Sequence, residues 1–336
     1  MKAVSLNFLC LWKKLKKRCW ACGFLDTIKW GIQNGKQRYK CKNCGILFTS
    51  SNTGLSKSNE EIWFKKWIIE RLTLRYLSAE MGISKRSLQR KFSTYLSSVP
   101  NFAIKHNKEA YLVIDGTYFP GDLCLILYYD SHIKYTQLYR FTDKERYVQI
   151  EEDLLNLIKL EITIKSITCD GHPAILKAIS TALPDVITQR CLVHIHRESN
   201  IWLRKKPVNQ KSIELKRIVN LIFLIKTSND KIAWIRMFNN WFESHKDHIN
   251  EKKINHETGR WWYRHKNLRR TAVMIKKAIP NMFHFLDNSN IPKSTNNLES
   301  FFGHLKDTLS IHRGLSRQNR RAFILWYLHY KNQTRR

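Results

Sequence analysis

A chain of 336 residues is long enough for two or three domains and at least one sizeable hydrophobic core. Lysine and arginine number 59 against 27 aspartate and glutamate, a formal net charge of +32. No stretch of 18 uninterrupted apolar residues exists, and basic residues rather than a small-residue cleavage site follow the short apolar run Phe8 to Trp12. These features argue against a membrane-spanning or secreted protein and favour one that binds nucleic acid.

The positive charge is concentrated at the two ends of the chain. Residues 1–100 carry a net charge of +15 and residues 260–336 carry +13, whereas residues 101–199 carry −2. A net charge of +15 in a hundred residues exceeds what solubility requires, so we expect the ends to bind phosphates. The middle segment holds nearly half of the acidic residues and is expected to use some of them in chemistry.

The cysteines near the N-terminus predict a zinc site. Four of the eight cysteines form two CxxC pairs with 18 residues between the pairs: Cys19, Cys22, Cys41 and Cys44. This spacing is typical of four thiolates that bind one Zn²⁺, and residues Thr27 to Tyr39 predict a β-hairpin between the pairs, which makes residues 1–55 a zinc ribbon. The alternatives are two unrelated CxxC pairs or a redox motif, but a redox pair normally stands alone near a βαβ unit. Metal-bound thiolates also indicate a reducing compartment.

Residues 56–105 predict a helix-turn-helix. Glu60 to Leu77 has apolar residues at helical spacing, Gly82 to Ser84 indicates a turn, and Ser84 can cap a basic helix. That second helix would pack Leu88 and Phe92 inward. To the major groove it would present Lys85, Arg86, Gln89 and Arg90. The alternative is an ordinary helical hairpin with a basic exposed face.

Residues 106–200 predict an α/β domain. The expected elements are strands at 110–114, 123–129 and 133–141, a helix at 144–160, a strand at 162–169, a helix from Gly171 and a strand at 186–191. This order, βββαβαβ, is that of the RNase H-like fold, a mixed sheet with helices on its faces. Asp115 and Asp170 follow the first and fourth strands. If these strands are neighbours, the two carboxylates lie side by side as oxygen ligands suited to Mg²⁺.

A third carboxylate is expected near the C-terminus, where residues 260–336 contain only three acidic residues. Glu299 lies in a predicted helix that Thr295 or Ser294 can cap. The buried stripe of this helix would consist of Leu298, Phe301, Phe302, Leu305 and Leu309. Glu299 would lie at the edge of that stripe, with Asn296 and Lys306 on the same face. A helical glutamate with no other context is most often a solvated surface residue.

Four motifs point to one known family. They are Asp115-Gly-Thr, Cys169-Asp170-Gly-His, Cys191-Leu-Val-His194 and Thr295-Asn-Asn-Leu-Glu299-Ser. Through them the chain, from residue 19 to about 330, resembles the Mutator-type DDE transposases of bacterial insertion sequences, in the variant with an N-terminal zinc ribbon. The resemblance implies an RNase H-like catalytic core at 106–200, an all-α insertion at 201–292, and C-terminal helices at 293–336 that complete the core.

The resemblance also implies a mechanism. Asp115, Asp170 and Glu299 would hold two catalytic Mg²⁺ ions, for which Mn²⁺ can substitute, and these would clamp the attacking and leaving oxygens of a phosphoryl displacement. Water would first free a 3′-hydroxyl at the end of the insertion sequence, and that hydroxyl would then attack target DNA. His194 would contact the scissile phosphate or support the metal ligands. Core packing and helix capping are the alternative role for Cys191 and His194.

Basic and aromatic residues near the C-terminus are expected to bind DNA. Arg260 and Trp261 begin a cluster, ending at Arg264, that resembles an Arg-Trp element whose tryptophan stacks on a displaced base; packing inside the insertion's own core is the alternative. Asn296 and Lys306 would face the DNA. The DNA backbone would be held by Arg313, Arg317, Arg320 and Arg321.

The sequence therefore predicts a transposase that binds terminal inverted repeats and cleaves and joins DNA strands. Its partners would be double-stranded DNA, from the terminal repeats and the target, and a second copy of the chain in a synaptic dimer. We expect it in the prokaryotic cytoplasm, associated with the nucleoid. Two alternatives remain: a domesticated DNA-binding derivative, which would not need the three acids, and an RNase H-type nuclease or resolvase, which would not need a sequence-reading N-terminal module.

Overall fold

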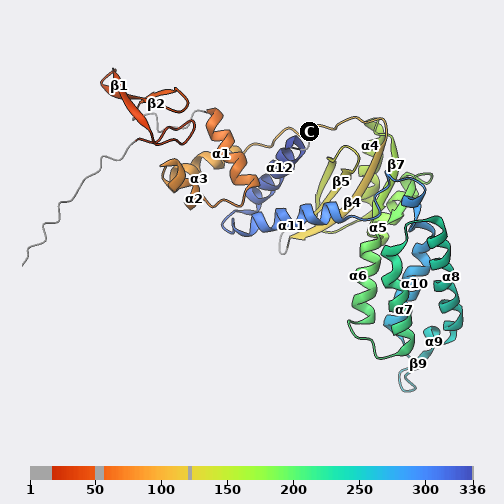
Figure 1. The fold of residues 1–336 in the computed structure, drawn as a ribbon. Helices are drawn as coiled ribbons and strands as arrows, with labels where there is room; N and C mark the ends of the chain where they lie inside the picture. Colours follow the sequence, from red (N-terminus) through yellow and green to blue (C-terminus); the bar gives the residue numbers. More distant parts are fainter. Residues whose placement is uncertain (1–16, 50–56, 120–122, 335–336) are drawn as a thin grey trace, which may run out of the picture. The chain divides into compact units, whose positions relative to one another are not determined.

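The computed structural model describes residues 17–49, 57–119 and 123–334 (Figure 1). By its packing the chain divides into two compact units. Unit 1 combines the N-terminal part up to Pro100 with Asp307–Tyr330, and unit 2 combines Asn101–Lys306 with the residues from Lys331 onward. The segment predicted as one domain at 293–336 is therefore shared between the units. Among the described helices, none is long and apolar enough to cross a membrane, and the run Phe8 to Trp12 lies outside the described residues.

Unit 1 begins with a three-stranded antiparallel sheet. Its strands, in spatial order, are β1 (Thr27–Gln33), β2 (Lys36–Cys41) and β3 (Leu47–Thr49). The predicted hairpin is present, because Asn34 and Gly35 form a two-residue turn in which both residues have positive φ. The third strand was not predicted, since its three residues are too few to show an alternating pattern.

Three helices follow in unit 1: α1 (Lys57–Ile69), α2 (Leu74–Met81) and α3 (Lys85–Leu96). The single helical stretch expected over Glu60 to Leu77 is instead two helices, because the Thr73 hydroxyl accepts a hydrogen bond from the Tyr76 amide at 3.2 Å and starts α2. Between α2 and α3, Gly82 has a φ of 64°, and the Ser84 hydroxyl accepts from the Ser87 amide at 3.1 Å. The predicted turn and cap are therefore present.

The last helix, α12 (Arg317–Thr334), supplies aromatic residues to the core of unit 1. The Trp326 indole donates to the Tyr95 carbonyl at 3.0 Å and packs edge-on against Phe64. Phe323 packs edge-on against Trp67. These contacts explain why the C-terminal helix belongs to the same compact unit as α1 and α3, although more than 200 residues separate them in the sequence.

A mixed five-stranded sheet forms the centre of unit 2. Its strands are β4 (Ala110–Phe119), β5 (Leu123–Asp130), β6 (Tyr135–Thr142), β7 (Ile164–Cys169) and β8 (Ile187–Arg190). The spatial order is β6-β5-β4-β7-β8, in which β4, β7 and β8 run parallel and β5 is antiparallel to both neighbours. Every residue of β5 is buried, which explains its uninterrupted apolar sequence.

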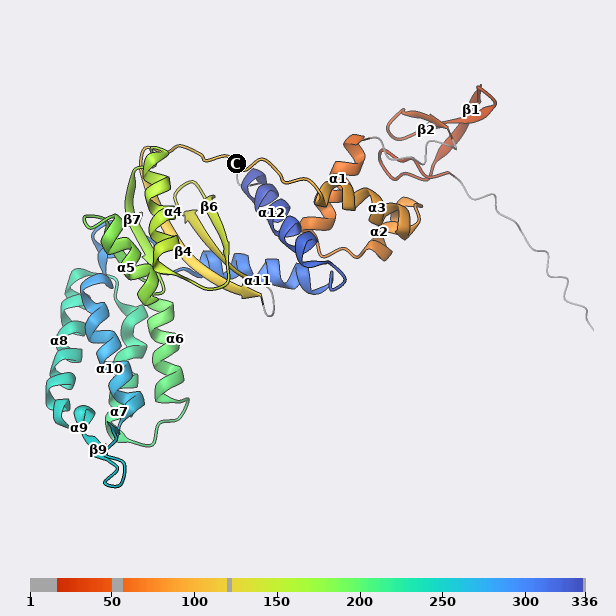
Figure 2. The same ribbon diagram turned by 180° about the vertical axis from the view of Figure 1, so that it is seen from behind.

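Helices cover both faces of this sheet. On one face lie α4 (Tyr147–Lys159) and α5 (Pro173–Ala182), and on the other runs the first part of α11 (Asn296–Ser310) (Figures 1 and 2). The α4 and α5 side forms a core of aliphatic side chains from both helices and from β4, β5 and β7. The predicted order of strands and helices over residues 106–200 is confirmed.

One strand boundary in this region was wrong. The predicted first strand ends at Ile114, but β4 continues to Phe119. Backbone pairing with β5 extends as far as the pair Phe119 and Leu123, so the strand continues beyond the apolar residues from which it was predicted. Asp115 is therefore an internal residue of β4. It still directly follows the end of the parallel pairing with β7, whose last pair is Ile114 and Cys169.

The segment between β8 and α11 is mainly a bundle of helices (Figure 1). The helices are α6 (Leu192–Leu203), α7 (Gln210–Asn220), α8 (Ser228–Ser244), α9 (Lys246–Asn250) and α10 (Lys266–Ala278), with short 3-10 helices at Leu221–Leu224, Ile279–Asn281 and His284–Leu286. Its core contains large side chains from α7, α8 and α10, including Leu215, Phe238 and Ile275.

The expectation of an all-α insertion was wrong in one place. β9 (Lys252–Ile254) pairs antiparallel with β10 (Trp261–Tyr263). Their turn is stabilised by the Asn255 side chain, which accepts hydrogen bonds from the amides of Glu257 and Thr258, and by Gly259 at a φ of 65°. Strands of three residues leave no periodic pattern that the sequence analysis could detect.

Candidate functional site

Asp115 and Asp170 lie side by side at the centre of the unit 2 sheet. The parallel pairing of β4 and β7 ends with Ile114 opposite Cys169, so the next residue on each chain is an aspartate. Burial and, after it, the negative charge of Asp170 raise the pKa of Asp115 to about 7. The predicted neighbour relation between these two acids is therefore present.

Glu299, in the first turn of α11, is the third carboxylate near Asp115. Its charge also raises the pKa of Asp115, so Asp115 interacts with both Asp170 and Glu299. One carboxylate oxygen of Glu299, Oε2, accepts a hydrogen bond from Arg197 at 2.6 Å. The other, Oε1, lies 3.5 Å from Nε2 of His194 and is buried without a hydrogen-bond partner among the residues that the structure describes. Glu299 is half-buried at the edge of the α11 stripe, as predicted.

A short network holds the start of α11 against the sheet. The Thr295 amide donates to the Sγ atom of Cys191 at 3.3 Å, and the Thr295 hydroxyl lies 3.3 Å from Nδ1 of His194. The Leu192 amide donates to the carbonyl of Lys293 at 3.0 Å. Cys191 is fully buried, so its contact with Thr295 has the packing role that was the alternative for this residue. Through these contacts the CxxH motif determines where Glu299 lies.

His194 adds positive charge to the site. Burial opposes its protonation, but the hydrogen bond with Cys191 and the charges of Cys191, Asp115 and Asp170 raise its pKa to about 9. In the metal-free protein the imidazole is therefore a cation at neutral pH. It lies between Thr295, through Nδ1, and Glu299, through Nε2.

The turn after Asp170 can accommodate only glycine at position 171. Gly171 has a φ of 90°, and a Cβ atom at this position would collide with the guanidinium group of Arg190. That guanidinium donates to the Asp170 carbonyl at 3.2 Å, while the Asp170 carboxylate accepts from the His172 amide at 2.7 Å. The strand end, the glycine and the arginine together determine the orientation of the carboxylate.

A fourth carboxylate, Glu145, lies near Asp170 and was not predicted from the sequence. Its side chain is 7% exposed, its Oε2 atom lies 3.2 Å from Nδ1 of His172, and its Oε1 atom occupies the space beside Gly116 where a Cβ would otherwise lie. Burial and the charge of Asp170 raise the pKa of Glu145, so the two carboxylates are near neighbours. Glu145 follows β6 in a charged turn that has no motif, and only the tertiary fold reveals its position.

Arg197 was also missed. It lies three residues after His194, and residues at this spacing share one face of a helix. The spacing could have suggested that both side chains reach the same carboxylate, as the contacts with Glu299 show.

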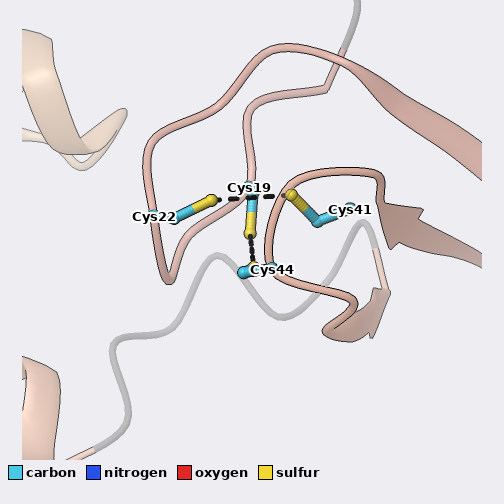
Figure 3. A group of neighbouring side chains, drawn as sticks. All are labelled: Cys19, Cys22, Cys41 and Cys44. Carbon is cyan, nitrogen blue, oxygen red and sulfur yellow. Dashed lines mark hydrogen bonds between the residues drawn. The ribbon is translucent and has the colours of Figure 1, made fainter.

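The four predicted zinc-ligand cysteines lie together in unit 1 (Figure 3). The Sγ atoms of Cys19 and Cys44 are 3.5 Å apart, as are those of Cys22 and Cys41. Four thiolates around one Zn²⁺ lie about 3.8 Å from one another, given Zn–S bonds of roughly 2.3 Å. The cluster is therefore compatible with structural zinc.

The two CxxC turns have the same geometry. The amide that follows each pair donates to the carbonyl of the pair's first cysteine, Gly23 to Cys19 at 2.9 Å and Gly45 to Cys41 at 3.0 Å. Both glycines have a φ of 74°. The four thiols interact: the Phe24 amide, followed by the neighbouring thiols, lowers the pKa of Cys22 to about 6, whereas burial and the other three thiols raise the pKa of Cys44 to about 12.

The part of unit 2 that carries Asp170, Cys191 and His194 is similar to a known protein family. Residues 161–224 match the family described as Transposase, Mutator family. The match supports a Mutator-type transposase, a DNA-processing enzyme. It runs from the residues before β7 to the 3-10 helix after α7, so it includes His194 and Arg197 but neither Asp115 nor Glu299. No curated protein matches the chain.

The side chains that the sequence predicts to contact DNA are accessible. On α3, Leu88 and Phe92 are buried, whereas the following are exposed: Lys85, Arg86, Gln89 and Arg90. Four of the predicted DNA-contacting residues outside α3 are also exposed: Arg260, Asn296, Lys306 and Arg313. Trp261 is 51% exposed and lies 4.2 Å beneath the Lys252 ammonium, so the alternative that it packs in the insertion core is wrong.

Proposed function

We propose that the chain is a DDE transposase of an insertion sequence, which binds terminal inverted repeats and catalyses Mg²⁺-dependent strand cleavage and 3′-hydroxyl strand transfer. The observation that carries this proposal is the convergence of Asp115, Asp170 and Glu299 in a chain that matches Mutator transposases at 161–224. The βββαβαβ order and the mixed sheet support an RNase H-like core. The test is Mg²⁺-dependent nicking of a labelled duplex that carries an end of the insertion sequence.

The carboxylates fit Mg²⁺, which prefers oxygen ligands. The buried Oε1 atom of Glu299 has no hydrogen-bond partner among the described residues, and the raised pKa of Asp115 indicates that negative charge is incompletely balanced. Asp115, Asp170 and Glu299 would hold the ions, which when bound activate the attacking oxygen and stabilise the leaving one.

The protein's own residues orient this site. Arg197 holds one oxygen of Glu299, Oε2, while the other, Oε1, lies 3.5 Å from Nε2 of His194 and has no hydrogen-bond partner among the described residues. Protonated His194 can donate a hydrogen bond to a phosphate oxygen, since its Nε2 atom already lies beside Glu299. The Glu145–His172 pair supports the turn that carries Asp170.

Glu145 gives a prediction specific to this arrangement. Glu145→Gln should lower strand cleavage about 10- to 100-fold and raise the Mg²⁺ concentration required for half-maximal cleavage, because residues that support metal ligands typically have effects of this size. The exposed carboxylate of Asp185 provides the matched control, Asp185→Asn. An unchanged Mg²⁺ requirement in Glu145→Gln would show that Glu145 is only a packing residue.

In the proposed transposase, α3 reads the terminal repeats as the second helix of a helix-turn-helix, and the basic residues of both chain ends hold the phosphates. Two copies of the chain would bind the two ends of the insertion sequence in a synaptic dimer. The protein would act at the nucleoid in the prokaryotic cytoplasm.

Binding to DNA should weaken steeply with salt. If about eight phosphates are neutralised, log K against log salt should have a slope near −7. Lys85→Ala and Arg86→Ala should reduce binding to the terminal repeat more than binding to a random duplex. The control, Arg75→Ala, removes an exposed positive charge from α2 and should affect both duplexes equally. If all three variants lost equal affinity for both duplexes, α3 would not recognise the base sequence of the terminal repeat.

Zinc should hold the N-terminal sheet together. Cys22→Ser should lower the zinc content by one ion per chain and remove hydrogen-exchange protection from β1 and β2, because a sheet this small has almost no core without its metal. Cys124→Ala changes a cysteine in unit 2 and should keep the zinc. Full zinc content in Cys22→Ser, measured by elemental analysis, would contradict the zinc ribbon.

A further inference from the structure

A second group of potential metal ligands lies at the base of the β9–β10 hairpin of unit 2. His248 is in α9, Glu251 immediately precedes β9, and His265 follows β10 and precedes α10. One ligand atom from each of the three residues lies within 4.8 Å of the other two. Within the described residues, this group and the four cysteines are the two such clusters of His, Cys, Asp or Glu.

We propose that His248, Glu251 and His265 bind a second Zn²⁺ ion. Two imidazoles and one carboxylate form a ligand set that zinc uses, with water in the fourth position. Ligand atoms about 2.1 Å from a tetrahedral ion lie about 3.4 Å from one another. The Nε2 atom of His265 is already 3.1 Å from Oε2 of Glu251, and the His248 and His265 rings lie 3.7 Å apart between centroids.

The polar atoms of the cluster favour a bound cation. Nε2 of His248 is buried and has no hydrogen-bond partner among the described residues, a cost that coordination would remove. The Glu251 carboxylate is held through its other oxygen, Oε1, which accepts from Arg264 at 2.6 Å. Oε2 is thereby directed toward the histidines, as second partners commonly orient metal ligands.

The site would stabilise a part of the chain that has little core of its own. β9 and β10 pair over three residues each, and two-stranded hairpins of this length are marginal in water. Below the last pair, the Arg264 amide donates to the Glu251 carbonyl at 2.9 Å. A metal that joins Glu251 to His265 and His248 would close the hairpin at its base and anchor it to α9. The exposed Trp261 and Trp262 would then be held in a fixed position.

Zinc stoichiometry of the full chain tests the proposal without DNA or activity. After equilibration with Zn²⁺ and dialysis against a weak chelator, the wild type should retain two ions per chain. His248→Gln and His265→Gln should each retain one, and the remaining ion should leave on modification of the cysteine thiols. The matched control, His256→Gln, changes an exposed histidine in the same hairpin and should retain two.

A second measurement separates metal loss from misfolding. Hydrogen exchange at residues 252–263 should accelerate in His248→Gln, while the amides of α7, α8 and α10 should stay protected. If a histidine variant loses protection in those helices as well, the variant has misfolded, and Glu251→Gln is used instead. That variant should bind one zinc ion per chain and keep the helices protected. One zinc per wild-type chain, or two in His248→Gln or in Glu251→Gln, would overturn the proposal. These results are independent of the cleavage assay that tests the proposed function.

Discussion

Asp115→Asn, Asp170→Asn and Glu299→Gln should each lower Mg²⁺-dependent strand cleavage by about 10³-fold or more, which corresponds to about 4 kcal/mol of transition-state stabilisation. Each substitution removes a negatively charged oxygen ligand but keeps the size of the side chain. DNA binding should persist, because the basic ends of the chain are unchanged and the loss of a carboxylate relieves repulsion of the phosphate. The measurement is nicking of a labelled end by each purified variant, with DNA affinity measured in parallel.

The control for these variants is Asp185→Asn, which changes an exposed carboxylate of the same unit and should keep near-normal activity. Asp130 would be a poor control, because it is fully buried and its carboxylate accepts from the His132 amide at 3.0 Å. Near-normal cleavage by Glu299→Gln would show that another residue is the third metal ligand. Near-normal cleavage by Asp115→Asn would contradict the DDE assignment.

The metal-free protein should become less stable as the pH rises from about 4 to about 7. The pKa of Asp115 is raised from 3.8 to about 7 in the fold, so the stability that its neutral form contributes is complete below pH 3.8 and is lost as the pH passes 7. A shift of roughly three units corresponds to about 4 kcal/mol. The raised pKa of His194 acts in the same direction at higher pH, because the stability from its protonation is lost as the pH passes about 9.

Urea unfolding in Mg²⁺-free buffer, followed by hydrogen exchange at β4, measures this effect. At pH 8, Asp115→Asn should be more stable than the wild type, and at pH 4 the two should differ little. Mg²⁺ should stabilise the wild type at pH 8 and not the variant, since binding to the folded state alone shifts the unfolding equilibrium. Equal stability of the two proteins at pH 8 would mean that the carboxylates do not strain the fold.

Local patterns predicted most of the secondary structure and part of the site. The CxxC spacing located the cysteine cluster, and the α11 stripe is buried as expected except for Leu309, which is half-buried. The order of strands predicted Asp115 beside Asp170 if their strands were neighbours; β4 and β7 are neighbours, and their parallel pairing ends just before both residues. These features depend on residues close together in the sequence or on strand order alone.

Other features depend on contacts that no local pattern records. Glu145 reaches the site only because Gly116, on a different strand, leaves room for its carboxylate. The place of Glu299 depends on contacts of Thr295 with Cys191, about a hundred residues earlier in the chain. The hairpin of β9 and β10 depends on a side-chain turn at Asn255 rather than on strand periodicity.

The tight fit of Gly171 against Arg190 means that the geometry around Asp170 depends on more than the acidic residues themselves. A variant that keeps Asp115, Asp170 and Glu299 can still lose this geometry, because any side chain at position 171 would displace the arginine and, with it, the backbone that presents Asp170. Gly116 is vulnerable in the same way through Glu145. For the proposed transposase, a survey that scores gene copies by Asp115, Asp170 and Glu299 alone would therefore overestimate the number that are active.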